Sequence, residues 1–211
     1  MKKSCTYFDC THPLIYLTES NDESNFRKKI AVTKEYKGNR KKQDKPAHYE
    51  AVRQYLKENY DTQVIKGYEA DDALGINHTK NKDTTVIVTI DKDLVQIPGK
   101  HFNLDSLKYF EVDELEGARS LFTQVLQGDA ADDVPGAPGL GKGRVKELLK
   151  DATSIRELYE ITRSPYDPTT KLGQKHIPYW TEEKWLESCN LVFIFREKGE
   201  TFEQWSRKYA N

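Results

Sequence analysis

Short apolar stretches in the first half of the chain predict strands that alternate with helices. Residues 13–18 and 62–66 have the length and apolar character of short strands, and residues 101–104 favour another. Residues 84–90 are rich in β-branched side chains and almost continuously apolar. A stretch of this kind predicts a strand that is buried on both faces of a parallel sheet.

Apolar positions at helical spacing fall between and after these strands. They predict a helix over residues 46–60, a second one beginning near Glu69, and a third over residues 113–127. From Asp129 onward the pattern is mostly helical, apart from a polar, Pro-containing surface loop over residues 163–178. Strands that alternate with helices and then give way to helices alone are typical of an α/β fold with a helical extension.

These elements define the fold class and the domain organisation that we expect. The fold class is α/β, with a mostly parallel sheet flanked by helices. An α/β core would cover residues 1–127, and a helical part would cover residues 128–211. A length of 211 residues is compatible with one domain, or with one domain and a small appendage.

Composition excludes several classes of protein. Only 36% of the residues are hydrophobic, the mean hydropathy is −0.81, and no apolar stretch approaches the ~20 residues of a membrane helix. The basic N-terminus lacks the apolar stretch of a secretory signal. Three cysteines without metal-site spacing indicate free thiols in a reducing compartment. We therefore expect a cytoplasmic protein that does not enter the membrane.

Acidic residues at close spacing form three groups beside apolar stretches. Carboxylates this close repel one another unless cations lie between them. Oxygen ligands without an organised set of His or Cys side chains favour Mg²⁺ or Mn²⁺ over Zn²⁺. Each group alone also fits a helix N-cap or a solvated acidic turn, but three groups at the ends of successive elements predict a divalent-metal site for phosphoryl chemistry. The candidate ligands are Glu69, Asp71, Asp72, Asp91, Asp93, Asp129 and Asp132.

Spacing within these groups predicts how the side chains point. Glu69 and Asp72 are three residues apart, so in the first turn of a helix they would share a face. Asp71 would point elsewhere, to a second cation or a shared water. Asp129 and Asp132 have the same spacing and would face one cation. Asp91 directly follows the predicted strand over residues 84–90. This strand would bring Asp91 to the carboxyl edge of the sheet, where open parallel sheets bind ligands.

A glycine-rich turn follows the third acidic group. It matches the G-x-x-x-x-G-K pattern of a phosphate-binding P-loop, but Gly143 replaces the Ser or Thr that would bind Mg²⁺, and no strand leads directly into it. The remaining interpretations are an ordinary connection between helices and a hairpin between two helices, whose backbone N–H groups approach a phosphate. Nucleic-acid contacts would then come from Gly136, Gly139, Gly141, Lys142 and Arg144.

Residues 27–45 are strongly basic, as is typical either of a solvated loop or of a segment that binds nucleic acid. Tyr36 could stack on a base, while Lys37 and Arg40 bind phosphate. The net charge is only −1, but metals that neutralise the candidate ligands would leave a mildly basic protein. Such a surface around an acidic site suits a polyanionic substrate.

Taken in chain order, these segments resemble the 5′-nuclease superfamily of flap endonucleases and 5′→3′ exonucleases, especially its short phage members. The resemblance is carried by FRKKIAVTKEYKGNRKK, YEADDALG, VTIDKDLVQI and QGDAADDVPGAPGLGKGRVKELL, in matching order and spacing over residues 14–150. It implies a PIN-like α/β domain that hydrolyses phosphodiesters near the 5′ ends of DNA or RNA–DNA strands in replication, primer removal or recombination. The partner would be flap, nicked or 5′-ended duplex DNA. The protein would act as a monomer, in the host cytoplasm if it is phage-encoded.

The resemblance also implies two or more Mg²⁺ ions, or Mn²⁺ in their place. One metal would lower the pKa of a water molecule and present hydroxide to the phosphorus. The other metal, with Lys37 and Arg40, would stabilise charge on the phosphate and on the leaving oxygen. On this resemblance, Glu69, Asp71, Asp72 and Asp91 would hold or support the catalytic metal pair. Asp93, Asp129 and Asp132 would lie on the side of the second metal.

Two further regions match elements of the family. Lys37 and Arg40 match basic residues at the base of a helical arch, close to the scissile phosphate. Residues 46–60 would belong to that arch or to its return path. Residues 136–144 match a helix–hairpin–helix element that grips the backbone of duplex DNA, usually with a bound K⁺.

The chain departs from the family at its N-terminal side. The family normally opens with a strand that ends in a metal-binding Asp, whereas this chain begins about where the second strand is expected, and Asp9 does not fit the missing position. A further Asp normally follows the second strand, where Glu19 or Asp22 could replace it. A missing central strand would expose sheet edges. Without the first ligand, the alternative function is a nucleic-acid-binding homologue that cannot cut.

Overall fold

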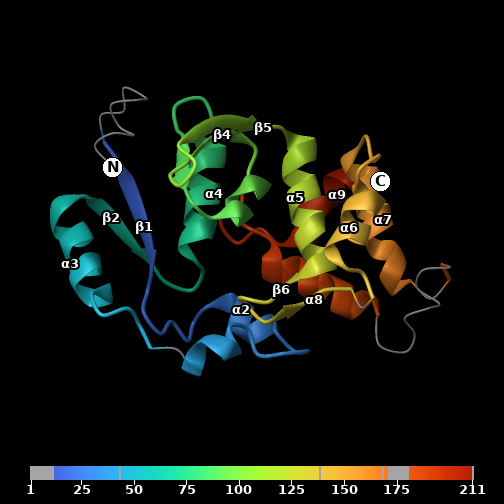
Figure 1. The fold of residues 1–211 in the computed structure, drawn as a ribbon, viewed down its shortest axis with the longest axis horizontal. Helices are drawn as coiled ribbons and strands as arrows, with labels where there is room; N and C mark the ends of the chain where they lie inside the picture. Colours follow the sequence, from blue (N-terminus) through green and yellow to red (C-terminus); the bar gives the residue numbers. More distant parts are fainter. Residues whose placement is uncertain (1–11, 43, 138, 168, 171–180, 211) are drawn as a thin grey trace.

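The structure of this chain is a computed structural model, which describes residues 12–42, 44–137, 139–167, 169–170 and 181–210. Strands and helices alternate along the first part of the chain, and helices dominate the C-terminal part (Figure 1). The α/β class with a helical extension is therefore confirmed.

The elements fall into three stretches of the chain. The first holds β1 (Leu14–Thr18), α2 (Phe26–Ile30), η1 (Gly38–Lys42), α3 (Tyr49–Asn59), β2 (Asp61–Ile65) and α4 (Ala70–Lys80). The second holds β3 (Ile87–Thr89), η2 (Lys92–Gln96), β4 (Gly99–Asn103), β5 (Lys108–Val112), α5 (Glu114–Gln127), β6 (Gly128–Asp129) and β7 (Val134–Pro135). The third holds α6 (Lys142–Leu149), α7 (Ile155–Arg163), η3 (Ser164–Tyr166), α8 (Glu182–Val192) and α9 (Phe202–Ala210).

The strands form three small sheets in the described part of the chain, where one mostly parallel sheet was expected. β1 pairs with β2 in parallel, with Leu14 opposite Asp61 and Thr18 opposite Ile65. β3 pairs in parallel with β4, which pairs antiparallel with β5, and β6 and β7 form a short antiparallel ribbon. The prediction of a single sheet is wrong for the described residues, among which β1 and β3 each pair with a neighbouring strand along one edge only, so that the two parallel pairs are not connected.

β3 is shorter and more exposed than the sequence predicts. It covers only Ile87–Thr89. The Ile87 side chain is 2% exposed and packs with Leu94, whereas Val88 is 36% exposed and Ile90 is 69% exposed. The prediction of burial on both faces is wrong because alternate residues of a strand point to opposite faces, and only one face of β3 packs into the interior.

The predicted helices are present. α3 lies within residues 46–60, α5 lies within residues 113–127, and α4 begins directly after Glu69. α7 continues to Arg163, so the predicted surface loop begins later than expected. Residues 171–178 of that predicted loop lie outside the described residues.

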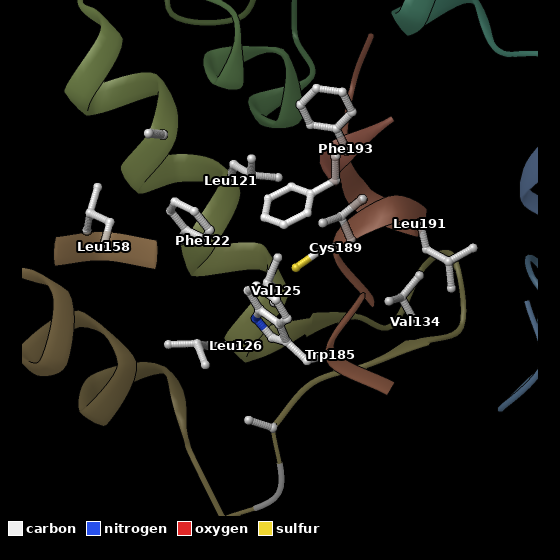
Figure 2. Close-up of a cluster of buried hydrophobic side chains, with 14 of the residues drawn as sticks. Leu121, Phe122, Val125, Leu126, Val134, Leu158, Trp185, Cys189, Leu191 and Phe193 are labelled. Carbon is white, nitrogen blue, oxygen red and sulfur yellow. The ribbon is translucent and has the colours of Figure 1, made fainter. Parts of the chain in front are cut away.

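α5 is the centre of the main hydrophobic core (Figure 2). Leu121, Phe122, Val125 and Leu126 are fully buried and pack with side chains of α6, α7, α8 and α9. Figure 2 shows Cys189 within this cluster, and its thiol is free and buried. The prediction of a free thiol is confirmed for this cysteine, and the other two cysteines lie outside the described residues.

This core includes residues from both predicted parts of the chain. α5 belongs to the predicted α/β core of residues 1–127, and α6 to α9 belong to the predicted helical part of residues 128–211. The division into two domains at residue 127 stays a prediction. Because the two parts share one apolar cluster, we expect them to unfold together. Among the described residues, no helix is long and apolar enough to cross a membrane.

Candidate metal and nucleic-acid site

Three segments from distant parts of the chain meet around a small acidic cavity. They are the first turn of α4, the start of η2 and the turn between β6 and β7. The cavity has a volume of about 40 Å³, which is enough for a cation or a few water molecules. Five of the predicted ligands line it: Glu69, Asp71, Asp93, Asp129 and Asp132.

Asp91 lies beside this cavity and caps η2. Its Oδ1 atom accepts a hydrogen bond of 2.9 Å from the backbone N–H of Asp93, so the N-cap alternative holds for one of its oxygens. After burial, the charge of Asp91 is the largest cause that raises the pKa of Asp71 and of Asp93. Asp91 therefore belongs electrostatically to the acidic group around the cavity.

Asp72 is the predicted ligand that the structure places elsewhere. Glu69 is the N-cap of α4, with an extended backbone, and the helix begins at Ala70. Asp71 and Asp72 are consecutive helical residues and so point to different sides, Asp71 toward the cavity and Asp72 into the interior at 0% exposure. The prediction that Glu69 and Asp72 share a face in the first turn of a helix is wrong because Glu69 precedes the helix.

Asp72 forms a buried ion pair with Arg27. Arg27 Nη1 lies 2.6 Å from Asp72 Oδ2, and Nη2 lies 2.8 Å from Oδ1. Asp72 also accepts hydrogen bonds from the backbone N–H groups of Glu69, at 2.9 Å, and Phe195, at 3.1 Å. Burial alone would lower the pKa of Arg27, but Asp72 holds it above its ordinary value. The pair ties α2 to the first turn of α4.

Sequence reasoning missed two residues that support the site, Asn25 and Arg27. The Asn25 side chain accepts a hydrogen bond of 3.0 Å from Arg27 N–H and donates one of 3.1 Å to Glu69 Oε1. An Asn directly before a short helix is a signal for an N-cap. No sequence signal distinguishes the buried Arg27 from the exposed cations that follow it, because the difference arises from contacts distant in sequence.

Tyr36 is buried, with 4% exposure, so its ring cannot stack on a base as the sequence predicts. Its hydroxyl lies 3.1 Å from Glu69 Oε2 and 2.9 Å from Asp132 Oδ2. A phenol carries one proton and therefore donates to one of these carboxylates at a time. Burial raises the pKa of Tyr36 well above its ordinary value, which keeps that proton in place. Tyr36 is part of the wall of the cavity.

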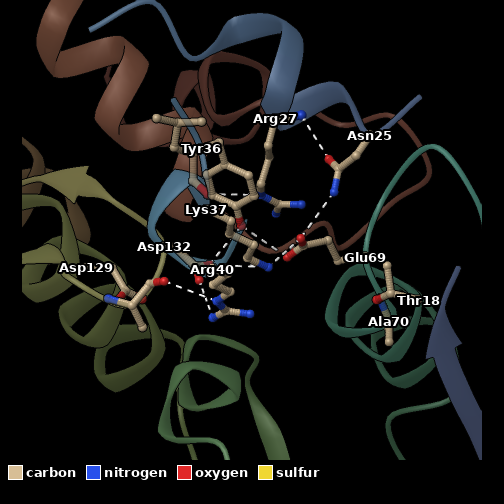
Figure 3. A network of polar contacts seen from close by, with 12 residues as sticks. Thr18, Asn25, Arg27, Tyr36, Lys37, Arg40, Glu69, Ala70, Asp129 and Asp132 are labelled. Atoms are coloured by element: carbon tan, nitrogen blue, oxygen red, sulfur yellow. Dashed lines mark hydrogen bonds and ion pairs between the residues drawn. The ribbon is translucent and has the colours of Figure 1, made fainter. Parts of the chain in front are cut away.

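Lys37 and Arg40 contact two of the carboxylates that line the cavity (Figure 3). Lys37 Nζ is 2.5 Å from Glu69 Oε1 and 3.5 Å from Asp132 Oδ2. Arg40 Nη2 is 2.5 Å from Asp132 Oδ1, and Arg40 Nε donates a hydrogen bond of 3.1 Å to the carbonyl oxygen of Ala131. The structure therefore places both predicted phosphate-binding cations directly on predicted metal ligands.

Backbone contacts fix the loop that carries Lys37 to the turn between β6 and β7. Lys37 N–H donates to the carbonyl oxygen of Asp132 at 2.9 Å, and Asn39 N–H donates to Asp133 Oδ2 at 2.6 Å. Lys37 and Asp133 have φ angles of 57° and 60°, a region that costs a non-glycine residue roughly 1–3 kcal/mol. Contacts between the two loops must hold these conformations in place.

Burial and mutual repulsion change the pKa values of the acidic residues. Burial, followed by the charges of Asp91 and Glu69, raises the pKa of Asp71 to about 7. Burial and Asp91 raise the pKa of Asp93 to about 6. Burial would also raise the pKa of Glu69, but nearby cationic side chains lower it below its ordinary value. Carboxyl groups that retain protons near neutral pH lack a counter-ion, which a divalent cation would supply.

The donor set fits Mg²⁺ or Mn²⁺ in its chemistry. Hard carboxylate oxygens line the cavity, and its lining residues include no His or Cys. Within the described residues, no three His, Cys, Asp or Glu side chains converge closely enough to hold a metal ion. Oxygens of Glu69 and Asp132 instead contact Tyr36, Lys37 and Arg40. The metal-binding role of each carboxylate stays a prediction.

The glycine-rich segment has a packed half and an open half. A Cβ atom on Gly136 would lie 2.3 Å from the backbone at the end of α5, so Gly136 serves close packing. Its contact with nucleic acid stays a prediction. Gly139 has a φ of 71° and turns the chain. Gly141 is the N-cap of α6 and has open space around it, while Lys142 and Arg144 are exposed on the first turn.

A strand ribbon, not a helix, leads into the glycine-rich turn. β6 and β7 lie between α5 and the turn, and α6 follows it. The predicted hairpin between two helices is therefore matched only by its second helix within the described residues. Contact of this turn with duplex DNA stays a prediction, which rests on the open Gly141 and the exposed cations of α6.

Neither candidate for the Asp after the second strand reaches the cavity. Asp22 is buried and accepts hydrogen bonds from the backbone N–H groups of Gly67, at 2.6 Å, and Ser24, at 2.9 Å. Glu19 lies 3.6 Å from Lys66 Nζ. The structure therefore gives no support to a replacement by either residue, because Asp22 binds backbone N–H groups near the end of β1 and Glu19 pairs with Lys66. Asp9 lies outside the described residues.

An α/β fold, carboxylates from three segments in one cavity and two cations that contact them are the features that the resemblance to 5′ nucleases implies. The family model of the 5′-3′ exonuclease N-terminal, resolvase-like domain matches residues 2–121. The chain belongs to this family, and the resemblance inferred from its motifs is confirmed.

Curated relatives agree with this assignment. The chain is 29% identical over 163 residues to flap endonuclease Xni of Shewanella sp. (strain ANA-3), which covers 70% of this chain and 62% of that protein. It is 28% identical to a 5′-3′ exonuclease of Mycoplasmopsis pulmonis, over 63% of this chain and 50% of that protein. It is 27% identical to DNA polymerase I of Caldicellulosiruptor bescii, over 69% of this chain and 20% of that protein. The chain spans less than two thirds of each relative.

Solved structures share the fold. A T5 5′-exonuclease with bound zinc has a TM-score of 0.65 at 17% identity, covering 90% of this chain and 77% of that chain. A bacteriophage T5 flap endonuclease in complex with DNA and metal ions has a TM-score of 0.64 at 15% identity, with the same coverage of 90% and 77%. At these identities the similarity establishes the fold alone.

Proposed function

We propose that this chain is a metal-dependent 5′ nuclease, an exonuclease or flap endonuclease that hydrolyses phosphodiesters near the 5′ ends of DNA or RNA–DNA strands. The observation that carries the proposal is that Lys37 and Arg40 contact the carboxylates that line the acidic cavity. A phosphate bound beside these carboxylates would meet both cations and the candidate metal ligands. The relatives named flap endonuclease and 5′-3′ exonuclease support the same activity.

Two or more Mg²⁺ ions, or Mn²⁺ in their place, are the proposed cofactors. Bound there, such ions would lower the pKa of a water molecule and act as Lewis acids on the phosphate. Asp72 is left out of the ligand set because Arg27 and two backbone N–H groups occupy its oxygens. The proposed ligands are Glu69, Asp71, Asp91, Asp93, Asp129 and Asp132.

The side chains of the chain itself would position the phosphate. Lys37 and Arg40 would bind its oxygens and offset the charge that develops during cleavage. Tyr36 would donate its single hydroxyl proton to Glu69 or to Asp132, one at a time, and so help to position these carboxylates. No protein nucleophile is needed in this scheme.

The start of α6 would hold the duplex backbone, with K⁺ as a further cation at the turn. Gly141 leaves room for a phosphate to approach the helix N-terminus, and Lys142 and Arg144 add charge. The partner would be flap, nicked or 5′-ended duplex DNA. The protein would act as a cytoplasmic monomer in replication, primer removal or recombination.

A nucleic-acid-binding homologue that does not cut is the second candidate function. It is favoured by the positions of Glu19 and Asp22, neither of which reaches the cavity. Neither of these two residues therefore supplies the metal ligand that normally follows the second strand in the family.

Incubation of a 5′-flap duplex with Mg²⁺ separates the two candidates. The wild-type chain is expected to release 5′ products with Mg²⁺ and not with EDTA. Asp71→Asn should slow release by at least about tenfold, whereas Asp105→Asn, at an exposed carboxylate in the turn after β4, should keep full activity. Binding of the duplex that weakens with salt, without metal-dependent release of product, would favour the homologue that does not cut.

A further inference from the structure

The Lys37 ammonium lies between two carboxylates that line the acidic cavity. Its Nζ atom is 2.5 Å from Glu69 Oε1 and 3.5 Å from Asp132 Oδ2. These carboxylates come from the start of α4 and from the turn between β6 and β7, so Lys37 bridges the two sides of the cavity. With 24% of its side chain exposed, Lys37 is the partly buried counter-ion of this pair.

A metal ion in the cavity would need to bind the same carboxylate oxygens that Lys37 contacts. Glu69 Oε1 already accepts hydrogen bonds from Lys37 and Asn25, and Glu69 Oε2 accepts one from Tyr36. A divalent ion binds a carboxylate oxygen at about 2.0–2.2 Å, which would leave it close to an ammonium that contacts the same oxygen. Their like charges repel, so the two cations cannot share Glu69 Oε1.

The Lys37 side chain can leave this position without movement of its loop. The backbone is held by the hydrogen bond of 2.9 Å from Lys37 N–H to the carbonyl oxygen of Asp132. The four-carbon side chain is flexible, and 24% of it is exposed, so Nζ can turn toward solvent. Arg40 differs, because its Nε atom is also bound to a backbone carbonyl.

We propose that Lys37 is a built-in counter-ion of the metal-free cavity, which a divalent cation displaces, so that metal loading releases the ammonium for a phosphate. This inference rests on the proposed function. In the metal-free protein the Lys37 ammonium contacts Glu69 and Asp132. In the metal-loaded protein it would contact a phosphate of the nucleic acid instead. Glu69 and Asp132 would then have a cation beside them in both states of the cavity.

Mn²⁺ titration of the purified chain at pH 8 without nucleic acid tests the exchange. Lys37→Met removes the competing charge and should bind Mn²⁺ roughly three- to tenfold more tightly than the wild type. Lys34→Met is the matched control, since Lys34 lies in the same loop and pairs with Asp133 outside the cavity, at 59% exposure. Its Mn²⁺ affinity should stay within about twofold of the wild type.

The outcomes separate this inference from the proposed function. Equal or weaker Mn²⁺ binding by Lys37→Met, or equal tightening in both variants, would overturn the role of Lys37 and leave the nuclease proposal in place. Absence of Mn²⁺ binding by the wild type and both variants would overturn both. Circular dichroism of each variant confirms that a change in affinity does not come from loss of the fold.

Pulse acetylation of the wild-type chain gives an independent readout. Acetic anhydride modifies amines in proportion to their access and to the fraction without a proton. If Mg²⁺ displaces the Lys37 ammonium from Glu69, the acetylation of Lys37 should rise several-fold on saturation with Mg²⁺, while that of Lys34 stays unchanged. An unchanged or slower acetylation of Lys37 would show that the metal does not displace it.

Discussion

Arg27 and Asp72 form a bidentate ion pair in the interior of the protein, with N–O distances of 2.6 and 2.8 Å and side-chain exposures of 3% and 0%. Asp72 Oδ2 also accepts the backbone N–H of Glu69 at 2.9 Å. The pair therefore fixes the first turn of α4, from which Glu69 and Asp71 face the acidic cavity. A buried pair of this kind organises the site, since Arg27 also lines the cavity while Asp72 lies behind it.

Loss of one partner of this pair is expected to destabilise the fold strongly. Arg27→Met leaves the Asp72 carboxylate buried without its cation, and we expect a loss of about 3–5 kcal/mol in the free energy of unfolding. Urea denaturation followed by circular dichroism measures it. Arg27→Met combined with Asp72→Leu removes both charges and should recover part of the loss. A single variant that loses less than about 1 kcal/mol, in the range of an exposed pair, would contradict the burial and geometry described.

Mn²⁺ binding should strengthen as pH rises. The pKa of Asp71 is raised to about 7 and that of Asp93 to about 6, chiefly by burial, so both carboxyl groups hold protons in the metal-free protein at mildly acidic pH. A metal ion binds only the ionised form, so its affinity should rise between pH 5.5 and 8, with release of protons.

Calorimetry in two buffers of different ionisation enthalpy measures this proton release at pH 6.5. Asp71→Asn should release fewer protons and show a flatter dependence of Mn²⁺ affinity on pH, whereas Asp105→Asn should behave as the wild type. Binding that is independent of pH in the wild type would show that these carboxyl groups are not the ligands.

Stability should fall with acid because His78 is buried in its neutral form. Its Nδ1 atom lies 2.8 Å from Thr85 Oγ1, and burial, with the nearby His101, lowers its pKa from 6.5 to about 4. The unfolded chain takes up the proton first, so this contribution is present above about pH 6.5 and is lost as the pH falls toward 4.

Urea midpoints between pH 4 and 7 measure this loss. His78→Asn removes the titrating ring and should flatten the dependence of the midpoint on pH. His48→Asn is the control, since His48 is exposed at the start of α3 and should leave the dependence unchanged. If His78→Asn kept the full slope, other groups would account for the acid sensitivity.

Two glycines of the predicted hairpin should respond differently to alanine. Gly136→Ala places a Cβ atom 2.3 Å from the backbone at the end of α5, and we expect a loss of at least about 1–3 kcal/mol in stability. Gly141→Ala faces open space and should cost less, about 0.5–1 kcal/mol as an N-cap change, but should weaken binding of duplex DNA. Thermal unfolding and fluorescence anisotropy with a labelled duplex distinguish the two effects. Unchanged DNA affinity in Gly141→Ala would remove the start of α6 from the interface.

The sequence predicted the meeting of the acidic groups better than the direction of each side chain. Each group follows the end of an element, and the α/β order brings such ends together. The direction of Asp72 depends instead on where α4 begins. Glu69 is an N-cap with an extended backbone, so the rule for residues three apart within a helix does not apply.

Tyr36 and β3 could not be placed correctly because their surroundings are set by segments distant in sequence. A tyrosine among cations is compatible with base stacking, but here its hydroxyl contacts Asp132, 96 residues further along the chain. The apolar run before Asp91 is compatible with burial on both faces. Only the pairing of strands determines that Val88 and Ile90 face outward.

Anomalous diffraction from crystals of the chain grown with Mn²⁺ tests the central claim most directly. The account predicts at least one anomalous peak in the acidic cavity, about 2.0–2.6 Å from carboxylate oxygens of Asp71, Asp93 or Asp132. It also predicts that the peak disappears in Asp71→Asn combined with Asp93→Asn. Mn²⁺ peaks at surface carboxylates alone, with Lys37 still on Glu69 and the cavity empty, would contradict it.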